Sequence, residues 1–526
     1  MAPKVLISDK MSPLAEKKFA ERGIEFDIKV GLDKEELAEV IGNYEGLAVR
    51  SATKVTEKIF QSADNLKVVG RAGIGVDNID IAAATSCGVI VMNTPLGNSI
   101  TTAEHAITMM MALARHIAAA DASTQAGKWE KSKFMGVEVA GKSLGIIGCG
   151  NIGSIVADRA MGLKMRVIAF DPFLSHERAA DLGVEKVELD ELFRRADFIS
   201  LHTPLTDKTR GIIDSKSMKK MKEGVRIINC ARGGLIVETD LKKALESGQV
   251  AGAALDVFEQ EPAESNVLFG VPSVICTPHL GAATTEAQEN VAEQVAEQMS
   301  DYLLTGAISN AVNFPSISAE EAPKIKPFVK LAEQLGSFAG QLTESGLKAV
   351  RIEYAGDIAE MNTRALTSAV LAGVLRPMLQ DANMVSATSL AKERGIAIEE
   401  VTRGQEGAYE TYIRLTLKTE RQNRSVAGTV FSDGKPRVIQ VKGINMEAEL
   451  GSYMLYTTNS DQPGFIGAIG TVFGQNKVNV ATFALGRETP GGDAIALIEV
   501  DEPITDEVLE SVRALPHVVQ AQKLRF

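Results

Sequence analysis

The segment Leu144-Gly145-Ile146-Ile147-Gly148-Cys149-Gly150-Asn151-Ile152-Gly153 decides the fold of the central part of this chain. An apolar, strand-like run leads directly into a GxGxxG turn, and a helical pattern follows from Ser154. In this context the first glycine permits a tight turn, the second lets the backbone approach a pyrophosphate, and the third lets helix and strand pack closely. The free N–H groups at the start of the helix favour a diphosphate. The segment therefore predicts a dinucleotide site formed by Gly148, Gly150, Asn151, Ile152 and Gly153.

The next strand-like run, residues 167–170, ends in Asp171. An acidic residue roughly 20 residues beyond the glycines of such a turn accepts hydrogen bonds from the adenosine ribose and repels the additional phosphate of NADP. Asp171 therefore favours NAD as the cofactor. For the glycines alone, a turn with a purely structural role is the alternative.

Short apolar runs on both sides of this segment predict two parallel α/β units. The first unit has runs at residues 5–9, 47–49, 67–70 and 89–93, and the second at 144–147, 166–170, 198–201, 226–229, 251–255 and 274–276. One helical pattern covers residues 101–124, and another covers 284–304. The second unit predicts a doubly wound Rossmann-type sheet.

The C-terminal part predicts two further domains of α+β type. Helical patterns cover residues 324–342 and 365–379, and β-rich stretches cover 409–419 and 426–441, the second interrupted by the hairpin signal Asp433-Gly434. Residues 452–526 follow the order βαββαβ, which is typical of a small ferredoxin-like domain.

Composition limits the class of partner and the compartment. The formal net charge of the 526 residues is −12, so we expect neither nucleic acid nor an anionic membrane as a partner. The longest apolar stretch, residues 107–114, is too short to cross a bilayer, and no signal peptide precedes the first strand. Cys87, Cys149, Cys230 and Cys276 show no paired spacing, which favours reduced thiols over disulfides or zinc. We expect a cytoplasmic protein without a bound metal.

Three strand ends of the Rossmann-type pattern carry residues suited to oxidising a hydroxyl group. They are Arg232 in Asn229-Cys230-Ala231-Arg232-Gly233-Gly234, Glu261 in Phe258-Glu259-Gln260-Glu261-Pro262, and His279 in Thr277-Pro278-His279-Leu280-Gly281. An arginine can hold a carboxylate with two hydrogen bonds, a histidine can accept the hydroxyl proton, and a glutamate can orient the imidazole. A surface arginine, a solvated loop glutamate and a structural loop histidine are the alternatives for each residue taken singly.

In this order the motifs GxGxxG, NCARGG, LDVFEQEP and TPHLGAAT, with the strand ending in Asp171 and the stretch VGRAGIGVDN at 69–78, resemble the D-2-hydroxyacid dehydrogenases. The resemblance spans roughly residues 1–310. It implies that Arg232, Glu261 and His279 are catalytic. It also implies cofactor contacts from Thr203, Pro204, Cys230, Ala231, Arg232, Asp256, His279 and Gly281.

The resemblance further implies how the chain is divided. A flavodoxin-like substrate-binding domain would comprise residues 1–96 and 285–310, and the NAD-binding domain would comprise 97–284. Residues 318–450 resemble the intervening domain of the long members of the family, and 452–526 resemble an ACT domain. Such domains commonly join subunits, so we expect a homodimer or homotetramer.

Within the family, residues 47–56, 92–95 and 127–130 resemble the branch that oxidises D-3-phosphoglycerate to 3-phosphohydroxypyruvate, the first step of L-serine synthesis. A phosphate requires converging cationic or N–H donors. The predicted substrate contacts are Arg50, Ser51, Arg71, Gly73, Ile74 and Gly75. Lys128, Lys131 and Lys133 are weaker candidates that would reach the site of a neighbouring subunit.

In the ACT-like segment, Asn459, Asp461 and Asn479 occupy the positions at which the family binds amino acids, which predicts serine as an effector. Serine-sensitive relatives often carry His or Tyr at the position of Asn459, so a domain that only joins subunits is the alternative. Two other functions stay open for the whole chain: an NAD-dependent glyoxylate or hydroxypyruvate reductase of the same family, and an NAD-sensing binding protein. The additional domains and Arg50 favour the phosphoglycerate branch.

Overall fold

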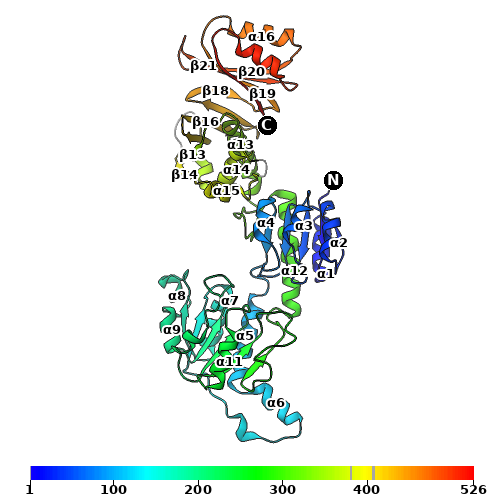
Figure 1. Ribbon diagram of the computed structural model, residues 1–526, viewed down its shortest axis with the longest axis vertical. Helices are drawn as coiled ribbons and strands as arrows, with labels where there is room; N and C mark the ends of the chain where they lie inside the picture. The colour runs from blue at the N-terminus through cyan, green and yellow to red at the C-terminus, as the bar shows by residue number, and fades with distance from the viewer. Residues whose placement is uncertain (1, 380–381, 405–408) are drawn as a thin grey trace.

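The computed structural model describes residues 2–379, 382–404 and 409–526. Four β-sheets, each with its own helices, follow one another along an elongated molecule (Figure 1). The N-terminal sheet lies in the middle of the molecule, between the Rossmann-type part and the two C-terminal parts (Figure 1). The chain therefore forms the first sheet and then the second. It passes back to the first sheet before it forms the last two.

The first sheet is parallel, with the strand order β2-β1-β3-β4-β5, which is the flavodoxin-like order. Its strands are β1 (Lys4–Ile7), β2 (Glu25–Ile28), β3 (Gly46–Val49), β4 (Val68–Arg71) and β5 (Ile90–Asn93). Its helices are α1 (Pro13–Glu21), α2 (Lys34–Val40), η1 (Ile41–Asn43), α3 (Glu57–Gln61) and α4 (Ile81–Ser86), and the later helix α12 (Thr285–Thr305) packs on β3, β4 and β5. A Cβ on Gly70 of β4 would lie 2.2 Å from the Met299 sulfur, so a glycine lets α12 approach the sheet.

The second sheet has seven parallel strands in the order β12-β11-β10-β9-β6-β7-β8. They are β6 (Ser143–Ile147), β7 (Arg166–Phe170), β8 (Glu185–Lys186), β9 (Phe198–Leu201), β10 (Val225–Asn229), β11 (Val250–Leu255) and β12 (Val274–Cys276). The helices are α5 (Ser99–Ala114), α6 (Ile117–Gln125), η2 (Lys131–Phe134), α7 (Asn151–Gly162), α8 (His176–Asp181), α9 (Leu189–Arg195), α10 (Ser215–Met218) and α11 (Glu238–Glu246). The strand order reverses between β6 and β9, and ligands of doubly wound sheets bind at such a switch point.

The predicted fold class is confirmed, but the single helix predicted over residues 101–124 is wrong. Two helices, α5 and α6, occupy this stretch, and they are separated at Arg115 and His116. His116 adopts a left-handed φ of 54°, which ends the first helix although no glycine or proline marks the position. The second helix and η2 form an arm that projects from the Rossmann-type part (Figure 1). Its side chains Trp129 and Met135 are 88% and 79% exposed.

The third sheet is mixed and has the order β14-β13-β15-β16-β17-β18. Its strands are β13 (Leu347–Ala355), β14 (Ala397–Arg403), β15 (Tyr412–Thr419), β16 (Asn423–Val430), β17 (Pro436–Val441) and β18 (Ile444–Ala448). The helices are α13 (Ala322–Gln341), η3 (Gly356–Glu360), α14 (Thr363–Leu375) and α15 (Ala387–Glu393). The helix predicted over residues 365–379 ends earlier than expected, at Leu375, and Arg376 is its C-cap residue.

The fourth sheet has the order β20-β21-β19-β22, and the chain follows the predicted βαββαβ order. Its elements are β19 (Tyr453–Ser460), α16 (Phe465–Gln475), β20 (Val480–Arg487), β21 (Asp493–Val500), α17 (Asp506–Arg513) and β22 (Val518–Arg525). Helices α16 and α17 cover one face of this sheet. The other face packs on α13, where Tyr456 and Phe338 meet edge to face at 5.8 Å. The third and fourth sheets thus share a core.

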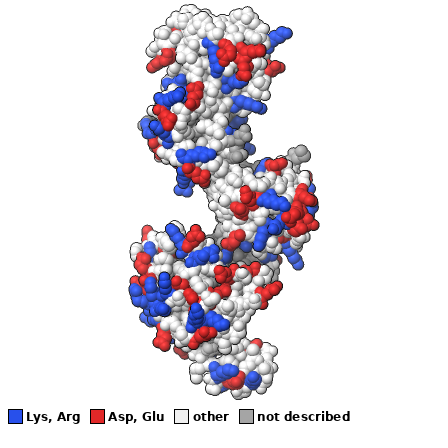
Figure 2. Space-filling model, in the orientation of Figure 1, with Lys and Arg blue, Asp and Glu red and all other residues white. Residues whose placement is uncertain are grey.

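The surface of the molecule carries both signs of charge. Figure 2 shows Lys and Arg side chains interspersed with Asp and Glu side chains over the visible face. Within residues 2–379, 382–404 and 409–526, the structure has no helix that combines the length and apolar character needed to cross a membrane.

We predict that Gly336→Ala destabilises the protein, because α13 and α14 cross in close contact there. A Cβ on Gly336 would lie 2.2 Å from the Val370 carbonyl oxygen, a backbone atom that cannot move aside. Overpacking of this kind costs about 1–3 kcal/mol, which calorimetry would detect as a lower melting temperature. The matched control is Gly474→Ala in α16, where a Cβ would have no neighbour within 4 Å. Equal melting temperatures for the two variants would contradict the packing argument.

Candidate active site

The glycine turn between β6 and α7 packs against the end of β9, at the switch point of the second sheet. Gly148 has a φ of 91°, and a Cβ there would lie 2.6 Å from the His202 carbonyl oxygen. A Cβ on Gly153 would lie 2.1 Å from the Gly148 carbonyl oxygen, so the first turn of α7 needs a glycine for its close approach. A Cβ on Gly150 would meet no atom within 4 Å, so protein packing does not explain the glycine at that position.

Two polar residues border this turn. Asp171 lies at the end of β7, where its carboxylate accepts hydrogen bonds from the backbone N–H groups of Cys149 and Phe173, both at 2.8 Å. Thr203 follows β9, and its buried hydroxyl oxygen has no hydrogen-bond partner in the part of the chain that the structure describes. This arrangement is suited to binding a dinucleotide. It combines an acidic residue beside the glycines, an unused hydroxyl group and the N-terminus of a twelve-residue helix.

His279 and Glu261 form a pair in the loops that follow β11 and β12. His279 Nδ1 and Glu261 Oε2 are 2.6 Å apart, and the other carboxylate oxygen of Glu261 accepts a hydrogen bond from the Phe258 N–H at 3.0 Å. Burial alone would raise the pKa of the Glu261 carboxyl, but the hydrogen bonds from His279 and Phe258 hold that pKa below its usual value. Glu261 is therefore ionised near neutral pH and fixes the orientation of the imidazole.

Arg232 connects the second sheet to the first. Its Nε donates to Asp77 Oδ2 at 3.0 Å, and its Nη1 donates to the Ala231 carbonyl at 2.6 Å. Asp77 belongs to the loop that follows β4. A Cβ on Gly75 of the same loop would lie 1.8 Å from Arg232 Nη2, so the guanidinium passes directly over the glycine backbone.

Arg71, at the end of β4, lies against the same loop. A Cβ on Gly73 would lie 1.6 Å from Arg71 Nη1. Burial and the nearby charge of Arg232 lower the pKa of Arg71 to about 10, and the charge of Asp77 opposes this shift. The Arg71 Nε is buried and has no hydrogen-bond partner within the described ranges. Two arginines with spare donors therefore border the loop at residues 73–75, as an anionic substrate requires.

The remaining predicted substrate residues lie at the edge of this region. Arg50 directly follows β3, and its Nη1 donates to the Lys10 carbonyl at 3.2 Å. Its charge also contributes to the lowered pKa of Arg71. Ser51 is exposed beside it, and the Ile74 carbonyl accepts a hydrogen bond from Asn93 at 2.6 Å. Lys133 pairs with Glu130 inside the projecting arm, at 3.5 Å.

Asp256 is fully buried and holds the loop that carries His279. Its carboxylate accepts hydrogen bonds from the N–H groups of Leu280 and Gly281, at 2.7 and 2.8 Å, and its backbone carbonyl accepts from the His279 N–H at 2.9 Å. His279 adopts a left-handed φ of 54°, a backbone conformation that residues other than glycine rarely adopt. The carboxylate thus stabilises the local backbone that orients the imidazole.

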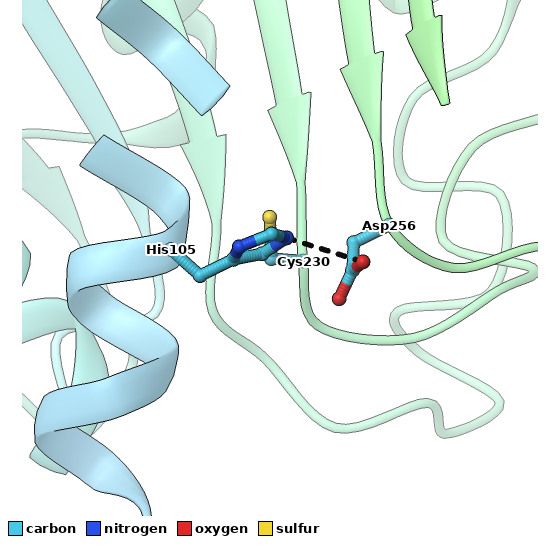
Figure 3. Close-up of side chains that lie close together, drawn as sticks. All are labelled: His105, Cys230 and Asp256. Carbon is cyan, nitrogen blue, oxygen red and sulfur yellow. Dashed lines mark ion pairs between the residues drawn. The ribbon is translucent and has the colours of Figure 1, made fainter. Parts of the chain in front are cut away.

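A second histidine, His105 on α5, completes the environment of Asp256. Its Nε2 lies 3.2 Å from Asp256 Oδ1, with the Cys230 sulfur beside it (Figure 3). Burial alone would raise the pKa of Asp256, but hydrogen bonds from His105, Thr277 and the Leu280 N–H hold it below its usual value. The ligand atoms of His105, Cys230 and Asp256 lie within 4.8 Å of one another, yet burial raises the pKa of the Cys230 thiol well above its usual range. We assign the cluster to hydrogen bonding.

Sequence reasoning missed His105 and Asp77. His105 lies in the middle of an Ala- and Met-rich helix, where a lone histidine carries no motif. Asp77 lies within the glycine-rich loop, but its partner Arg232 is 155 residues away in the chain. A contact of this kind has no local signature.

The three predicted effector residues of the fourth sheet have separate partners. Asn459 is buried and donates to the Ser460 carbonyl at 3.0 Å. Asp461 accepts from Arg487 Nη1 at 2.9 Å and from the Gly491 N–H at 3.0 Å, and these contacts lower the pKa of its carboxyl. Asn479 donates to Asp501 at 2.7 Å.

Three family models match the chain. The model for the NAD-binding domain of D-isomer-specific 2-hydroxyacid dehydrogenases matches residues 107–281. The model for the D-3-phosphoglycerate dehydrogenase intervening domain matches residues 324–442, and the model for the ACT domain matches residues 453–517. These matches confirm the predicted NAD-binding domain and the predicted ACT domain.

Curated relatives match over nearly the full length. D-3-phosphoglycerate dehydrogenase of Bacillus subtilis (strain 168) is 42% identical over 525 residues, which cover 99% of this chain and 99% of the relative. The enzyme of the same name from Archaeoglobus fulgidus is 41% identical over 522 residues, covering 98% and 99%.

Solved structures match about three fifths of the chain. NAD+-bound 3-phosphoglycerate dehydrogenase of Entamoeba histolytica has a TM-score of 0.51 at 30% identity, covering 60% of this chain and 99% of that one. A glyoxylate reductase from Paecilomyes thermophila has a TM-score of 0.55 at 30% identity, covering 59% and 98%.

We predict that Asp256→Asn lowers stability at neutral pH by about 1–3 kcal/mol, because it removes a buried acceptor from several donors. The folded pKa of Asp256 is depressed, so its contribution is present above the ordinary aspartate pKa of about 3.9 and is lost as the pH falls through the lower folded value. The melting-temperature difference between parent and variant should therefore be large at pH 7 and shrink below about pH 4. The exposed Asp64→Asn is the control. A difference that stays constant down to the acid transition would contradict this role.

Proposed function

This chain belongs to the D-3-phosphoglycerate dehydrogenases, NAD-dependent enzymes of the D-2-hydroxyacid dehydrogenase family, and we propose that it oxidises D-3-phosphoglycerate to 3-phosphohydroxypyruvate. The observation that carries the proposal is the 2.6 Å contact between His279 and Glu261, in a region where Arg232 reaches the glycine loop of the first sheet. The product would be the ketoacid from which L-serine is made, so the reaction would be the first step of serine synthesis.

The cofactor contacts follow from the turn between β6 and α7. Gly150 would let the backbone approach the pyrophosphate, while Gly148 and Gly153 permit the close turn, with Asn151 and Ile152 in the first turn of α7. Asp171 would accept hydrogen bonds from the ribose hydroxyls, and Thr203 and Pro204 would border the cofactor from the end of β9. Bound NAD would supply the acceptor for the hydride of the C2 carbon.

His279 would act as the acid/base residue. Its Nδ1 is bound to Glu261, so Nε2 is the nitrogen that can accept the proton of the C2 hydroxyl. The ionised carboxylate of Glu261 stabilises the imidazolium that results and keeps the ring oriented. In the reverse direction the same nitrogen would return the proton to the oxygen of the ketoacid.

Three arginines would bind the two ends of the substrate. Arg232 and the N–H groups of Gly73, Ile74 and Gly75 would hold the carboxylate and polarise the oxygen on C2. Arg50, with Ser51 and Arg71, would hold the phosphate. This arrangement uses the spare donors of Arg71 and places cations at both anionic groups of the substrate.

Two alternatives receive less support. The glyoxylate reductase from Paecilomyes thermophila covers 59% of this chain, whereas the D-3-phosphoglycerate dehydrogenase of Bacillus subtilis covers 99% of it. An NAD-sensing binding protein would not need the paired His279 and Glu261 beside Arg232.

We propose the domain division 1–96 with 285–310, 97–284, 318–450 and 452–526, and the presence of four separate sheets supports it. We further propose a homodimer or homotetramer, because the projecting arm exposes Trp129 and Met135. The four cysteines are all unpaired, which supports a cytoplasmic location. Serine bound at Asn459, Asp461 and Asn479 would compete with the hydrogen bond from Arg487 to Asp461.

We predict that Arg50→Ala weakens 3-phosphohydroxypyruvate reduction selectively, lowering kcat/KM about 10–100-fold, because one charge-assisted contact to the phosphate is lost. Unphosphorylated hydroxypyruvate should react at a nearly unchanged rate. Lys54→Ala, in the same exposed loop, is the matched control for a lost positive charge. Equal losses on both substrates would remove Arg50 from the phosphate site.

We predict that His279→Gln lowers kcat about 10²–10⁴-fold while the dissociation constant for NADH changes little, because the proton acceptor is lost. Stopped-flow and fluorescence titration would measure the two quantities separately. His176→Gln, on the exposed start of α8, is the control. A variant with near-parental turnover would exclude His279 from the acid/base role.

A further inference from the structure

Asp9 is a buried acidic residue just beyond the end of β1, and it is 5% exposed. Its carboxylate accepts a hydrogen bond from the Arg50 N–H at 2.6 Å and one from the Thr53 N–H at 3.1 Å. The Thr53 hydroxyl donates to the same carboxylate at 2.6 Å. A buried charge is costly unless donors of this kind surround it. The burial of Asp9 therefore requires the loop at residues 50–53 to keep one position.

The loop at residues 50–53 joins β3 to the segment that leads into α3, and it is held from two sides. Asp9 binds the N–H groups of its first and last residues. The side-chain amide of Asn78 donates to the carbonyl groups of the same two residues, Arg50 at 2.8 Å and Thr53 at 2.7 Å. The two residues between them are exposed. Two side chains from other parts of the chain thus fix the backbone at both ends of a short exposed loop.

The end of β1 also orients the guanidinium of Arg50. The backbone carbonyl of Lys10, the residue after Asp9, accepts a hydrogen bond from Arg50 Nη1 at 3.2 Å. Residues 9 and 10 therefore hold the backbone and the side chain of Arg50 at the same time. Because hydrogen bonds from a guanidinium to a phosphate are directional, the strength of such a contact depends on this placement.

The negative charge of Asp9 lies among the cations of the substrate region. Burial is the main reason for the lowered pKa of Arg71, and the charges of Arg232 and Arg50 lower it further. The charge of Asp9 opposes that shift, so it offsets part of the repulsion between the arginines. Both carboxylate oxygens of Asp9 accept hydrogen bonds from the loop, which leaves the guanidinium groups available to an anion.

We propose that Asp9 is a positioning residue that sets the preference for a phosphorylated substrate, because it fixes the 50–53 loop and with it Arg50. This inference rests on the proposed function, in which Arg50 binds the phosphate. Asp9 acts through the loop and does not touch the substrate. The carboxylate end of the substrate, which Arg232 would hold, does not depend on this loop. A change at Asp9 should therefore weaken binding of the phosphate end alone.

The variant Asp9→Asn tests this role, because it keeps the size of the side chain and turns one acceptor oxygen into a donor that faces the loop. We expect KM for 3-phosphohydroxypyruvate to rise about tenfold at a nearly unchanged kcat, the effect of roughly one lost hydrogen bond on binding. KM for hydroxypyruvate should stay near the parental value. A merely structural role would raise KM for both ketoacids alike, because they differ only in the phosphate.

The matched control is Asp27→Asn in the same sheet. The Asp27 carboxylate accepts a hydrogen bond from Tyr44 at 2.7 Å and pairs with Lys4 at 2.8 Å, so it holds other partners than the 50–53 loop. This control should keep both parental KM values.

Thr53→Val tests the same role even if Asp9→Asn does not fold, because it removes one donor to Asp9 and leaves the N–H groups bound. We expect KM to rise about two- to tenfold for the phosphorylated ketoacid only. Suppose that the parent prefers the phosphorylated ketoacid. Unchanged KM values in the variants, or equal rises for both substrates, would then overturn the role of Asp9 alone. A parent without that preference would overturn the proposed substrate and this inference together.

Discussion

The fully buried carboxylate of Asp256 is the constraint on which the geometry of the active site depends. It lies directly after β11 and accepts hydrogen bonds from the N–H groups of Leu280 and Gly281, which follow β12. Its backbone carbonyl holds the His279 N–H, and His105 connects it to α5. A buried charge is stable only when several donors surround it, so the two loops and the helix must keep one relative arrangement. This fixed arrangement sets the orientation of His279, the proposed acid/base residue.

The substrate region depends on two sheets that are far apart in the sequence. Arg232 from the second sheet donates to Asp77 from the first, and the glycines at 73 and 75 let Arg71 and Arg232 lie against the loop. The connection between β5 and α5 also packs closely on α12. A Cβ on Gly97 of this connection would lie 2.6 Å from a methyl group of Val291 in α12. Small residues at these positions let the arginines and the connections come close enough to form one site.

Sequence reasoning predicted the elements whose patterns are local. The apolar runs at β7 and β9 have the predicted bounds, because buried strands of a parallel sheet are continuous in hydrophobicity, and the run at the edge strand β12 has the predicted bounds as well. The two-residue strand β8 and the mixed-polarity strand β2 were missed, since neither has such a run. The break between α5 and α6 was also missed, because the left-handed residue His116 is not a glycine.

For the site, motifs identified Arg232, Glu261 and His279, and the structure brings His279 and Glu261 into contact. Asp77 and His105 act through long-range contacts, and so does the buried carboxylate of Asp256. No motif in the sequence records such contacts.

The most direct test of the central claim is the rate of NADH oxidation with 3-phosphohydroxypyruvate, hydroxypyruvate, glyoxylate and pyruvate measured in parallel. A site with cations at both ends of the substrate predicts a strong preference, in kcat/KM, for the phosphorylated ketoacid. Equal or faster reduction of glyoxylate would contradict the proposed substrate. Absence of turnover with all four compounds, despite tight NADH binding, would contradict the assignment of His279 and Glu261 as working catalytic residues.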